Sequence, residues 1–88
     1  MEAYELRVAA SAERALARLP EAAAAAIVEF LTGPLLANPT RVGKPLKLEL
    51  EGYRAARRGA YRIVYRIEDT CVVRVVRIDH RADVYRRR

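Results

Sequence analysis

Arginine dominates the part of this sequence that could do chemistry. Between Tyr53 and Arg66 the chain carries five Arg and no Asp or Glu. A guanidinium stays charged at any working pH, is a poor base, and donates paired hydrogen bonds that match the oxygens of a phosphate. The stretch therefore predicts a surface that binds anions, with a nucleic acid or an acidic protein as the partner.

The net charge of +6 is unevenly divided along the 88 residues. Residues 1–40 carry three Arg against five Glu, a net charge of −2, whereas residues 41–88 carry 14 basic against six acidic residues, a net charge of +8. A one-sided positive field attracts polyanions and raises their rate of encounter. The alternative interpretation is a solvated basic surface without a ligand.

Cleavage of RNA is one reaction that such a site permits. Attack of a 2′-OH on the adjacent phosphate needs a proton acceptor, a proton donor for the leaving 5′-oxygen, and positive charge on the phosphorane. His80 is the single histidine, so a two-histidine acid–base pair is excluded. Tyr85 is a substitute, because a phenol ionises more readily beside cations and Arg81 precedes it by four residues. The alternative for Tyr85 is a ring packed under the C-terminal tail.

Other catalytic constellations have little support. Asp79, His80 and Asp83 could be imagined as metal ligands, but the surrounding arginines oppose a cation, so neither a metal nor another cofactor is expected. Cys71 begins an apolar stretch and is predicted to be a buried thiol rather than a nucleophile paired with His80. The sequence has no glycine-rich phosphate loop and no zinc-type spacing of cysteine and histidine.

Composition bounds the class of protein. The length suits one small domain, residues 1–88, and 52% hydrophobic residues is enough for a core. A single cysteine cannot form an internal disulfide, and the N-terminus does not resemble a signal peptide. No window approaches the roughly 18–20 apolar residues that cross a bilayer. We therefore expect a soluble, cytoplasmic protein with no membrane partner.

The N-terminal half predicts a strand followed by two helices. Alternation of Tyr4, Leu6 and Val8 with charged residues predicts a strand at about 3–9. Ser11 is placed to cap a first helix, and Pro20 should end that helix and begin the second. The apolar positions of the second helix are Ala23, Ala26, Ile27, Phe30 and Leu31. Residues 33–39 should leave regular helix, and residues 43–52 should form a connector.

The C-terminal half predicts β-structure. Along residues 61–67, Tyr61 and Tyr65 alternate with Arg62 and Arg66, so the tyrosines should face the core and the arginines the opposite side. Residues 71–78 are rich in β-branched side chains and should form a central strand. The element order favours an α+β fold, with the N-terminal strand and a helical hairpin packed on one face of a mostly antiparallel four-stranded sheet. The uncovered face should display these arginines, together with Arg54.

Several motifs extend over nearly the whole chain. They are Arg18-Leu19-Pro20, Gly33-Pro34-Leu35-Leu36, Asn38-Pro39, Lys44-Pro45-Leu46, Leu50-Glu51-Gly52-Tyr53-Arg54, Arg57-Arg58-Gly59-Ala60-Tyr61-Arg62-Ile63-Val64-Tyr65, and His80-Arg81 leading to Asp83-Val84-Tyr85. Together they resemble the RelE/ParE toxins of bacterial toxin–antitoxin modules, which have a microbial RNase-like fold. The ending from His80 to Tyr85 resembles the RelE side, and in particular its actinobacterial branch.

The resemblance implies a function. RelE toxins of type II toxin–antitoxin systems are ribosome-dependent mRNA endonucleases. They enter the A site of the 30S subunit, where they contact rRNA and mRNA, and promote 2′-OH attack within the codon. The products are a 2′,3′-cyclic phosphate and a 5′-OH, and translation is inhibited. A cognate RelB-like antitoxin is the implied protein partner.

The resemblance also implies roles for single residues. Arg54 and Arg62 match basic positions that hold the phosphate, Arg81 matches the arginine that stabilises the transition state, and Tyr85 matches the proposed general base. Arg62, Arg81 and Tyr85 thus form the implied catalytic set. Some RelE proteins carry a further lysine where this chain has Ala56. The candidates that could substitute for it or complete the RNA-binding set are Arg57, Arg58, Lys44, Lys47 and His80.

Two alternative functions remain open on the sequence. A ParE-like inhibitor of DNA gyrase has the same fold but generally lacks the catalytic set, so Arg81 with Tyr85 argues against it. A homologue that binds RNA without cleaving it is the other alternative, because Ala56 replaces a residue of the active site.

Overall fold

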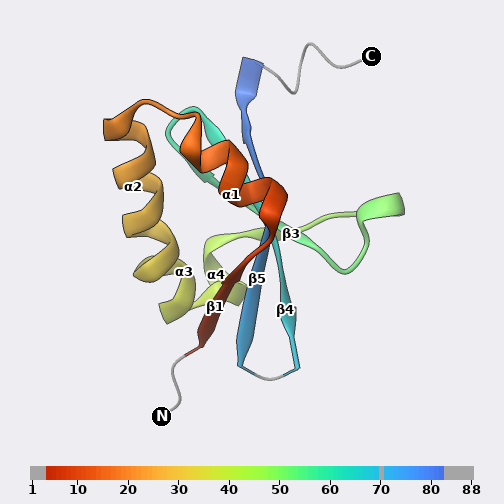
Figure 1. Ribbon diagram of the computed structural model, residues 1–88. Helices are drawn as coiled ribbons and strands as arrows, with labels where there is room; N and C mark the ends of the chain where they lie inside the picture. Colours follow the sequence, from red (N-terminus) through yellow and green to blue (C-terminus); the bar gives the residue numbers. More distant parts are fainter. Residues whose placement is uncertain (1–3, 70, 83–88) are drawn as a thin grey trace.

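The computed structural model describes residues 4–69 and 71–82, and these form a twisted five-stranded sheet with helices packed against it (Figure 1). The strand order is β1-β5-β4-β3-β2, in which β1 runs parallel to β5 and the other neighbours are antiparallel. The strands are β1 (Glu5–Val8), β2 (Lys44–Pro45), β3 (Arg54–Arg58), β4 (Tyr61–Glu68) and β5 (Val72–His80). This confirms the predicted α+β class, with one strand more than expected.

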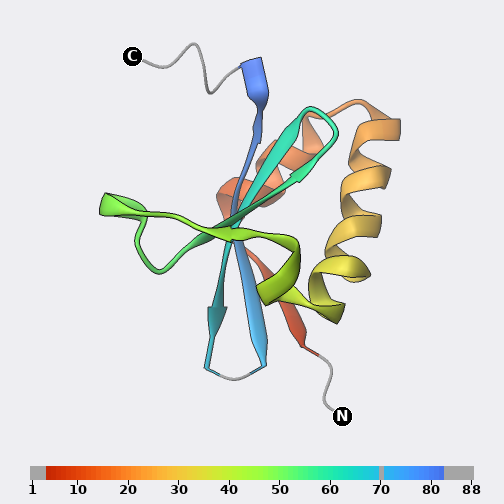
Figure 2. The ribbon, with the colours of Figure 1, turned by 180° about the vertical axis from the view of Figure 1, so that it is seen from behind.

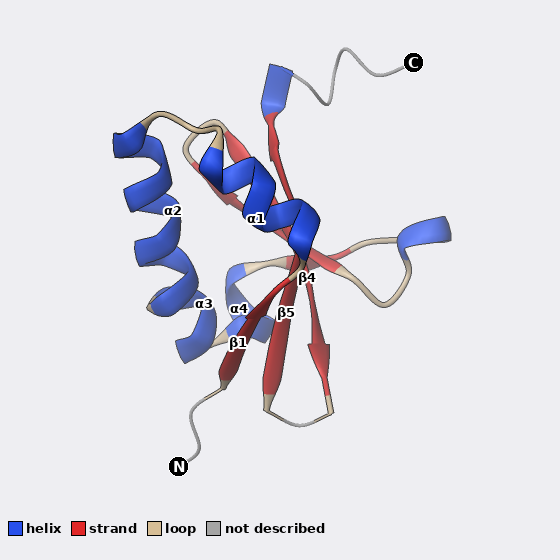
Figure 3. Cartoon of the chain, in the orientation of Figure 1, coloured by secondary structure: helices blue, strands red, loops and turns tan. Residues whose placement is uncertain are grey.

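The first two helices are α1 (Ala10–Ala17) and α2 (Glu21–Thr32), joined by a short connection that contains Pro20 (Figure 3). Pro20 is the N-cap of α2, so the predicted break between the helices is confirmed. The prediction that Ser11 caps α1 was wrong, because the N-cap is Ala9. The Ser11 hydroxyl instead donates a hydrogen bond to the Val76 carbonyl at 3.0 Å and so ties α1 to β5.

The segment after α2 is more regular than the sequence suggested. Residues 33–39 were expected outside regular helix, but α3 (Pro34–Ala37) lies within this stretch and α4 (Pro39–Val42) begins at its end. Each begins at a proline, whose fixed φ and missing N–H suit the first position of a helix. The expected connector then contributes β2, which is the fifth strand, and a 3₁₀ turn (Leu48–Leu50). Seen from behind, α4 and β3 lie on the near side of the molecule (Figure 2).

The pairing of β4 with β5 contains an irregularity that sets the arrangement of side chains. Val64 pairs with Arg77 and Tyr65 pairs with Val75, so the ladder skips Val76. An extra residue in one strand shifts its alternation by one position. Val75 before the bulge and Ile78 after it therefore both face the core, although their spacing is odd.

One hydrophobic cluster joins the helices to the sheet. It includes Ala12 of α1, Ile27 of α2, Tyr65 of β4 and Val73 of β5. Tyr65 is fully buried and Tyr61 packs against the cluster, which confirms that both tyrosines belong to the core side. The prediction of a buried Cys71 was wrong. It immediately precedes β5 and is exposed.

The other face of the sheet, which we call the open face, carries mostly charged side chains. Because strand neighbours in register share a face, the pairs place these residues together: Glu5, Arg7, Arg57, Arg62, Arg66, Glu68, Arg74, Arg77 and Asp79. Val64 lies among them and is only 1% exposed, so the arginine stems cover apolar surface there. Within residues 4–69 and 71–82, no helix is both long and apolar enough to cross a membrane.

Candidate functional site

Arg62 lies on the open face between charged neighbours on both sides. It pairs with Arg57 of β3 and with Asp79 of β5. The Asp79 Oδ2 atom is 3.6 Å from Arg62 Nη2 and 3.1 Å from Arg77 Nη2. We call Arg62, Arg77 and Asp79 the Asp79 cluster. Two guanidinium groups thus contact one carboxylate, and Arg57 adds a third positive charge beside Arg62, so this end of the open face stays positively charged.

The ion pairs that Asp79 Oδ2 makes in this cluster are not accompanied by hydrogen bonds. In the part of the chain that the structure describes, neither Asp79 Oδ2 nor Arg62 Nε has a hydrogen-bond partner, although both atoms are buried. The Arg62 side chain as a whole is 29% exposed. A buried donor or acceptor without a partner is costly, because it gave up its hydrogen bonds to water. The cluster therefore leaves one hydrogen-bond donor of Arg62 unused.

Arg81 lies at the same end of the sheet as Arg62. Its backbone N–H donates to the Ala60 carbonyl at 2.8 Å, and Ala60 is in the turn between β3 and β4, two residues before Arg62. The Arg81 side chain is exposed. Tyr85, the predicted general base, lies outside the described residues. The fold thus brings Arg57, Arg62 and Arg81 to one end of the sheet.

His80 faces the other way. Its ring meets the Tyr61 ring edge to face, with centroids 5.1 Å apart, on the side of the sheet that carries the helices. Its Nδ1 accepts a hydrogen bond from the Ala82 N–H at 3.0 Å. His80 therefore helps to end β5 and does not lie among the open-face arginines.

Arg54 does not share the open face with Arg62, and that prediction was wrong. It pairs with Tyr65 of β4, which faces the core. Its Nη2 atom donates to the carbonyl oxygens of Thr40 at 2.7 Å and Gly43 at 3.0 Å. Because these carbonyls lie at the end of α4 and just beyond it, Arg54 ties α4 to the sheet.

Tyr65 strengthens the same attachment. Its hydroxyl donates to the Pro39 carbonyl at 2.6 Å. Burial raises the pKa of Tyr65 above its ordinary value, and the neighbouring Arg54 guanidinium partly offsets this rise. A side chain at Gly43 would collide with the Tyr65 hydroxyl, so glycine is required for this close approach.

The remaining candidates are dispersed. Arg58 is on the helix side, with its guanidinium carbon 5.8 Å from the centre of the Phe30 ring, and it borders an apolar groove of about 400 Å³ between α2 and the β3–β4 turn. Lys44 of β2 pairs with Ala55 of β3, which pairs with Val64, so the register places Lys44 on the open face; Lys47 is exposed beyond β2. Ala56 is buried at 2% exposure and faces the core.

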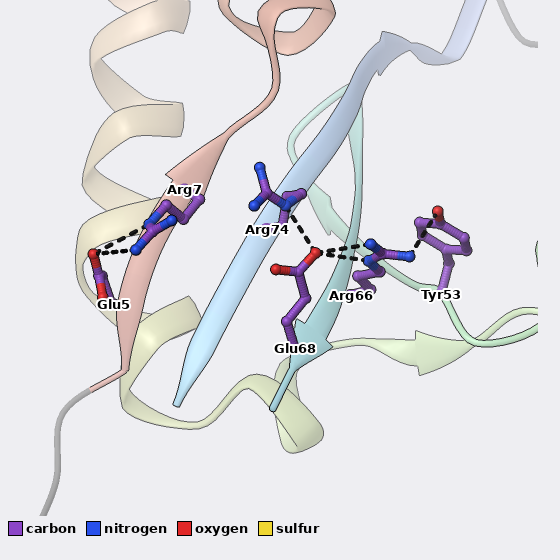
Figure 4. A network of polar contacts seen from close by, with 6 residues as sticks. All are labelled: Glu5, Arg7, Tyr53, Arg66, Glu68 and Arg74. Atoms are coloured by element: carbon purple, nitrogen blue, oxygen red, sulfur yellow. Dashed lines mark hydrogen bonds and ion pairs between the residues drawn. The ribbon is translucent and has the colours of Figure 1, made fainter. Parts of the chain in front are cut away.

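A second charged cluster on the open face was missed by the sequence analysis. Glu68 Oε2 accepts hydrogen bonds from Arg66 Nε at 2.9 Å and Arg74 Nε at 2.8 Å, and Arg66 Nη1 donates to the Tyr53 hydroxyl at 3.3 Å (Figure 4). We call these four residues the Glu68 cluster. The hydrogen bonds from Arg74 and then Arg66 lower the pKa of Glu68. The spacing of Arg66 and Glu68 on one strand was the available signal.

A metal site has no support in the described part of the chain, where no three His, Cys, Asp or Glu side chains could hold a metal ion together. Asp83, one of the three ligands considered from the sequence, lies outside those residues. Around Asp79 the nearest charges are two arginines, which would compete with a cation.

The comparisons with known proteins define the class. A family model described as the ParE toxin of the type II toxin–antitoxin system parDE matches residues 6–85. The chain therefore belongs to this RelE/ParE family of type II toxin–antitoxin toxins.

Individual relatives place the chain on the RelE side of the family. Toxin RelG of Mycobacterium tuberculosis is 54% identical over 86 residues, covering 96% of this chain and 98% of the relative. Toxin RelE of the same organism is 52% identical over 84 residues, covering 94% and 87%. This confirms the resemblance found in the motifs.

Solved structures agree with the fold. The toxin–antitoxin complex RelBE2 from M. tuberculosis matches with a TM-score of 0.85 and 48% identity, covering 90% of this chain and 99% of that chain. The archaeal RelE–RelB complex from Pyrococcus horikoshii matches with a TM-score of 0.70 and 22% identity, covering 89% and 94%. The second likeness is one of fold alone.

Proposed function

We propose that this toxin is a ribosome-dependent endoribonuclease that cleaves mRNA in the A site. The observation that carries the proposal is the convergence of Arg57, Arg62 and Arg81 at one end of the sheet, where Arg62 retains an unused buried donor. Positive charge preorganised around a phosphate stabilises the phosphorane of 2′-OH attack. The site has the charge for this chemistry and no metal is invoked.

Roles follow from which groups can change protonation. Arg62 and Arg81 stay charged, so they neutralise the phosphorane and the leaving 5′-oxygen and do not take the 2′-OH proton. Tyr85 takes that proton when it is ionised, a form that neighbouring guanidinium groups favour. The family resemblance alone supports the role of Tyr85. Arg57 faces Arg62 across the strands and is the favoured substitute for the lysine that Ala56 replaces.

The ribosome supplies what this site lacks. Arginines and one tyrosine form a weak acid–base set, so free RNA should be cleaved poorly. A ribosome that holds the 2′-OH in line with the phosphate would raise the cleavage rate by orienting the reacting groups. We therefore place the protein in the cytoplasm, acting on mRNA held in the 30S A site and touching rRNA through its other basic side chains.

The proposed protein partner is a RelB-like antitoxin. Two of the matching structures are toxin–antitoxin complexes. The basic open face should attract an acidic segment, since complementary charge speeds association and suppresses wrong partners. Inhibition would then consist of covering the arginines that the RNA needs.

The test is translation in vitro, with primer extension on the message to map cleavage. We expect cuts within A-site codons from the wild-type toxin. Tyr85→Phe removes the proton acceptor and keeps the ring, so cleavage should slow by about 10²- to 10⁴-fold while ribosome binding persists. Intact messages together with inhibited DNA gyrase would contradict the proposal and support the ParE-like alternative. Intact messages with RNA bound would support a non-catalytic homologue.

A further inference from the structure

We infer that Asp79 is a positioning residue for Arg62. Asp79 attracts the Arg62 guanidinium by its charge without a hydrogen bond, and Arg62 exchanges this contact for the RNA phosphate when RNA binds. This inference rests on the proposed function, because Arg62 is there assigned to the phosphate. The Asp79 side chain is 18% exposed and Arg62 is 29% exposed, so both are partly withdrawn from water. Charges in such a setting attract more strongly than at a fully exposed surface.

The geometry shows that Asp79 restrains Arg62 without satisfying all of its hydrogen-bond donors. Asp79 Oδ2 approaches only the terminal Nη2 atoms of Arg62 and Arg77, at 3.6 and 3.1 Å. Within the described residues, that oxygen and Arg62 Nε have no hydrogen-bond partner. A phosphate oxygen can therefore offer Arg62 a better bond than Asp79 does, because charge-assisted hydrogen bonds to phosphate are short and paired.

Asp79 also reduces repulsion within the cluster. Arg57, Arg62 and Arg77 lie on neighbouring strands of one face, and like charges placed so are destabilising. The Asp79 carboxylate contacts Arg62 and Arg77 and keeps these two guanidinium groups together before RNA arrives. It also weakens their hold on the singly charged phosphodiester of the ground state.

These two effects have opposite consequences for binding and for rate. Removing the charge of Asp79 should tighten ground-state binding, because Arg62 and Arg77 lose their competitor. It should also slow cleavage, because Arg62 loses the charge that orients it, and only an interaction stronger in the transition state accelerates the chemistry. Loss of a residue needed only for folding would not tighten RNA binding while slowing cleavage.

The Glu68 cluster provides a matched control. It has the same arrangement of charges, with one carboxylate between an arginine of β4 and an arginine of β5 on the same face. One oxygen of its carboxylate accepts hydrogen bonds from both arginines, and none of its residues is assigned to the reaction. Glu68→Gln therefore removes one negative charge from the open face without touching Arg62.

The experiment measures single-turnover cleavage on ribosomes that carry a message in the A site, over a range of toxin concentrations. For Asp79→Asn we expect the half-saturating concentration to fall and the maximal rate to fall, each by about 2- to 5-fold, the range of a partly exposed ion pair. Asp79→Glu keeps the charge and should recover part of the rate. Glu68→Gln should leave both quantities unchanged.

A second measurement separates this inference from the proposed function. Binding of a short RNA is followed as salt is raised, since the slope reports the number of phosphate contacts. Asp79→Asn should bind more tightly at low salt and show a steeper slope than Glu68→Gln, even if the wild-type toxin cleaves no message. Equal effects of the two variants, or weaker RNA binding by a folded Asp79→Asn protein, would overturn the inference.

Discussion

Each of the two carboxylate clusters of the open face holds one carboxylate between an arginine of β4 and an arginine of β5, but their geometries differ. Glu68 reaches the Nε atoms of Arg66 and Arg74 at 2.9 and 2.8 Å, whereas Asp79, one methylene shorter, reaches only terminal Nη2 atoms. The Glu68 cluster is closed, and the Asp79 cluster keeps buried groups unpaired. The hydrogen bonds that an arginine already makes, rather than the number of charges nearby, therefore determine whether it can bind a ligand.

The comparison is tested most strongly by removing one arginine from each cluster. Arg62→Ala should lower the single-turnover cleavage rate by about 10²-fold or more, the usual loss when one preorganised donor is removed. Arg66→Ala should lower it by less than about 3-fold, because the guanidinium of Arg66 is already bonded to Glu68 and Tyr53. Thermal unfolding checks that both variants are folded. Similar losses in the two variants would remove the distinction.

Arg54 extends the comparison to an arginine whose Nη2 the fold has already engaged, although in the described part of the chain its Nε is, like that of Arg62, buried without a partner. Arg54→Ala leaves the carbonyls of Thr40 and Gly43 without their donor, so the free energy of unfolding should fall by about 1–3 kcal/mol. The cleavage rate per folded molecule should stay near that of the wild type. Urea unfolding gives the stability, and active-site titration with ribosomes gives the folded fraction. A loss of rate at unchanged stability would return Arg54 to the phosphate site.

The face of Arg54 shows what the sequence could and could not predict. Alternation along β4 correctly placed Tyr65 on the core face and Arg62 on the open face, because that strand is regular. The same argument could have placed Arg54. A two-residue turn pairs Arg58 with Tyr61, so Arg54 pairs with Tyr65 and shares its core-facing side. That signal was present and was not used, so Arg54 was assigned to the wrong face.

Asp79 could not have been placed by alternation. The bulge at Val76 shifts β5 by one residue, and only the folded register brings Asp79 opposite Arg62. Bulges depend on packing between distant segments, here including the hydrogen bond from Ser11 to the Val76 carbonyl. The short helices after Gly33 and Asn38 were likewise missed because proline was taken as the end of a helix rather than as its start.

The contribution of the Glu68 cluster to stability should depend on pH in the acid range. The pKa of Glu68 is lowered in the folded state, so its ionised form stabilises the protein above the pKa of the unfolded chain, and this contribution disappears as pH falls through the folded-state pKa. The difference in unfolding free energy between wild type and Glu68→Gln should therefore shrink on going from neutral to acid pH. Urea unfolding at several pH values measures it. In an Arg74→Ala background the pH dependence should be weaker, and a constant difference would contradict the hydrogen-bonded geometry.

The smallest effect is expected at the third carboxylate of the open face, Glu5. Glu5 Oε2 is 2.9 Å from Arg7 Nη2, as short as the contacts of Glu68 (Figure 4), but the two side chains are 58% and 48% exposed. Water screens such a pair, and holding two long side chains together costs conformational entropy. Glu5→Gln should therefore change the free energy of unfolding by less than about 0.5 kcal/mol, as measured by urea unfolding, and should leave cleavage unchanged. A loss above about 1 kcal/mol would mean that distance alone ranks the three carboxylates. A negligible loss would mean that burial decides which of them matters, because Glu5 Oε2 also accepts two hydrogen bonds, both from Arg7.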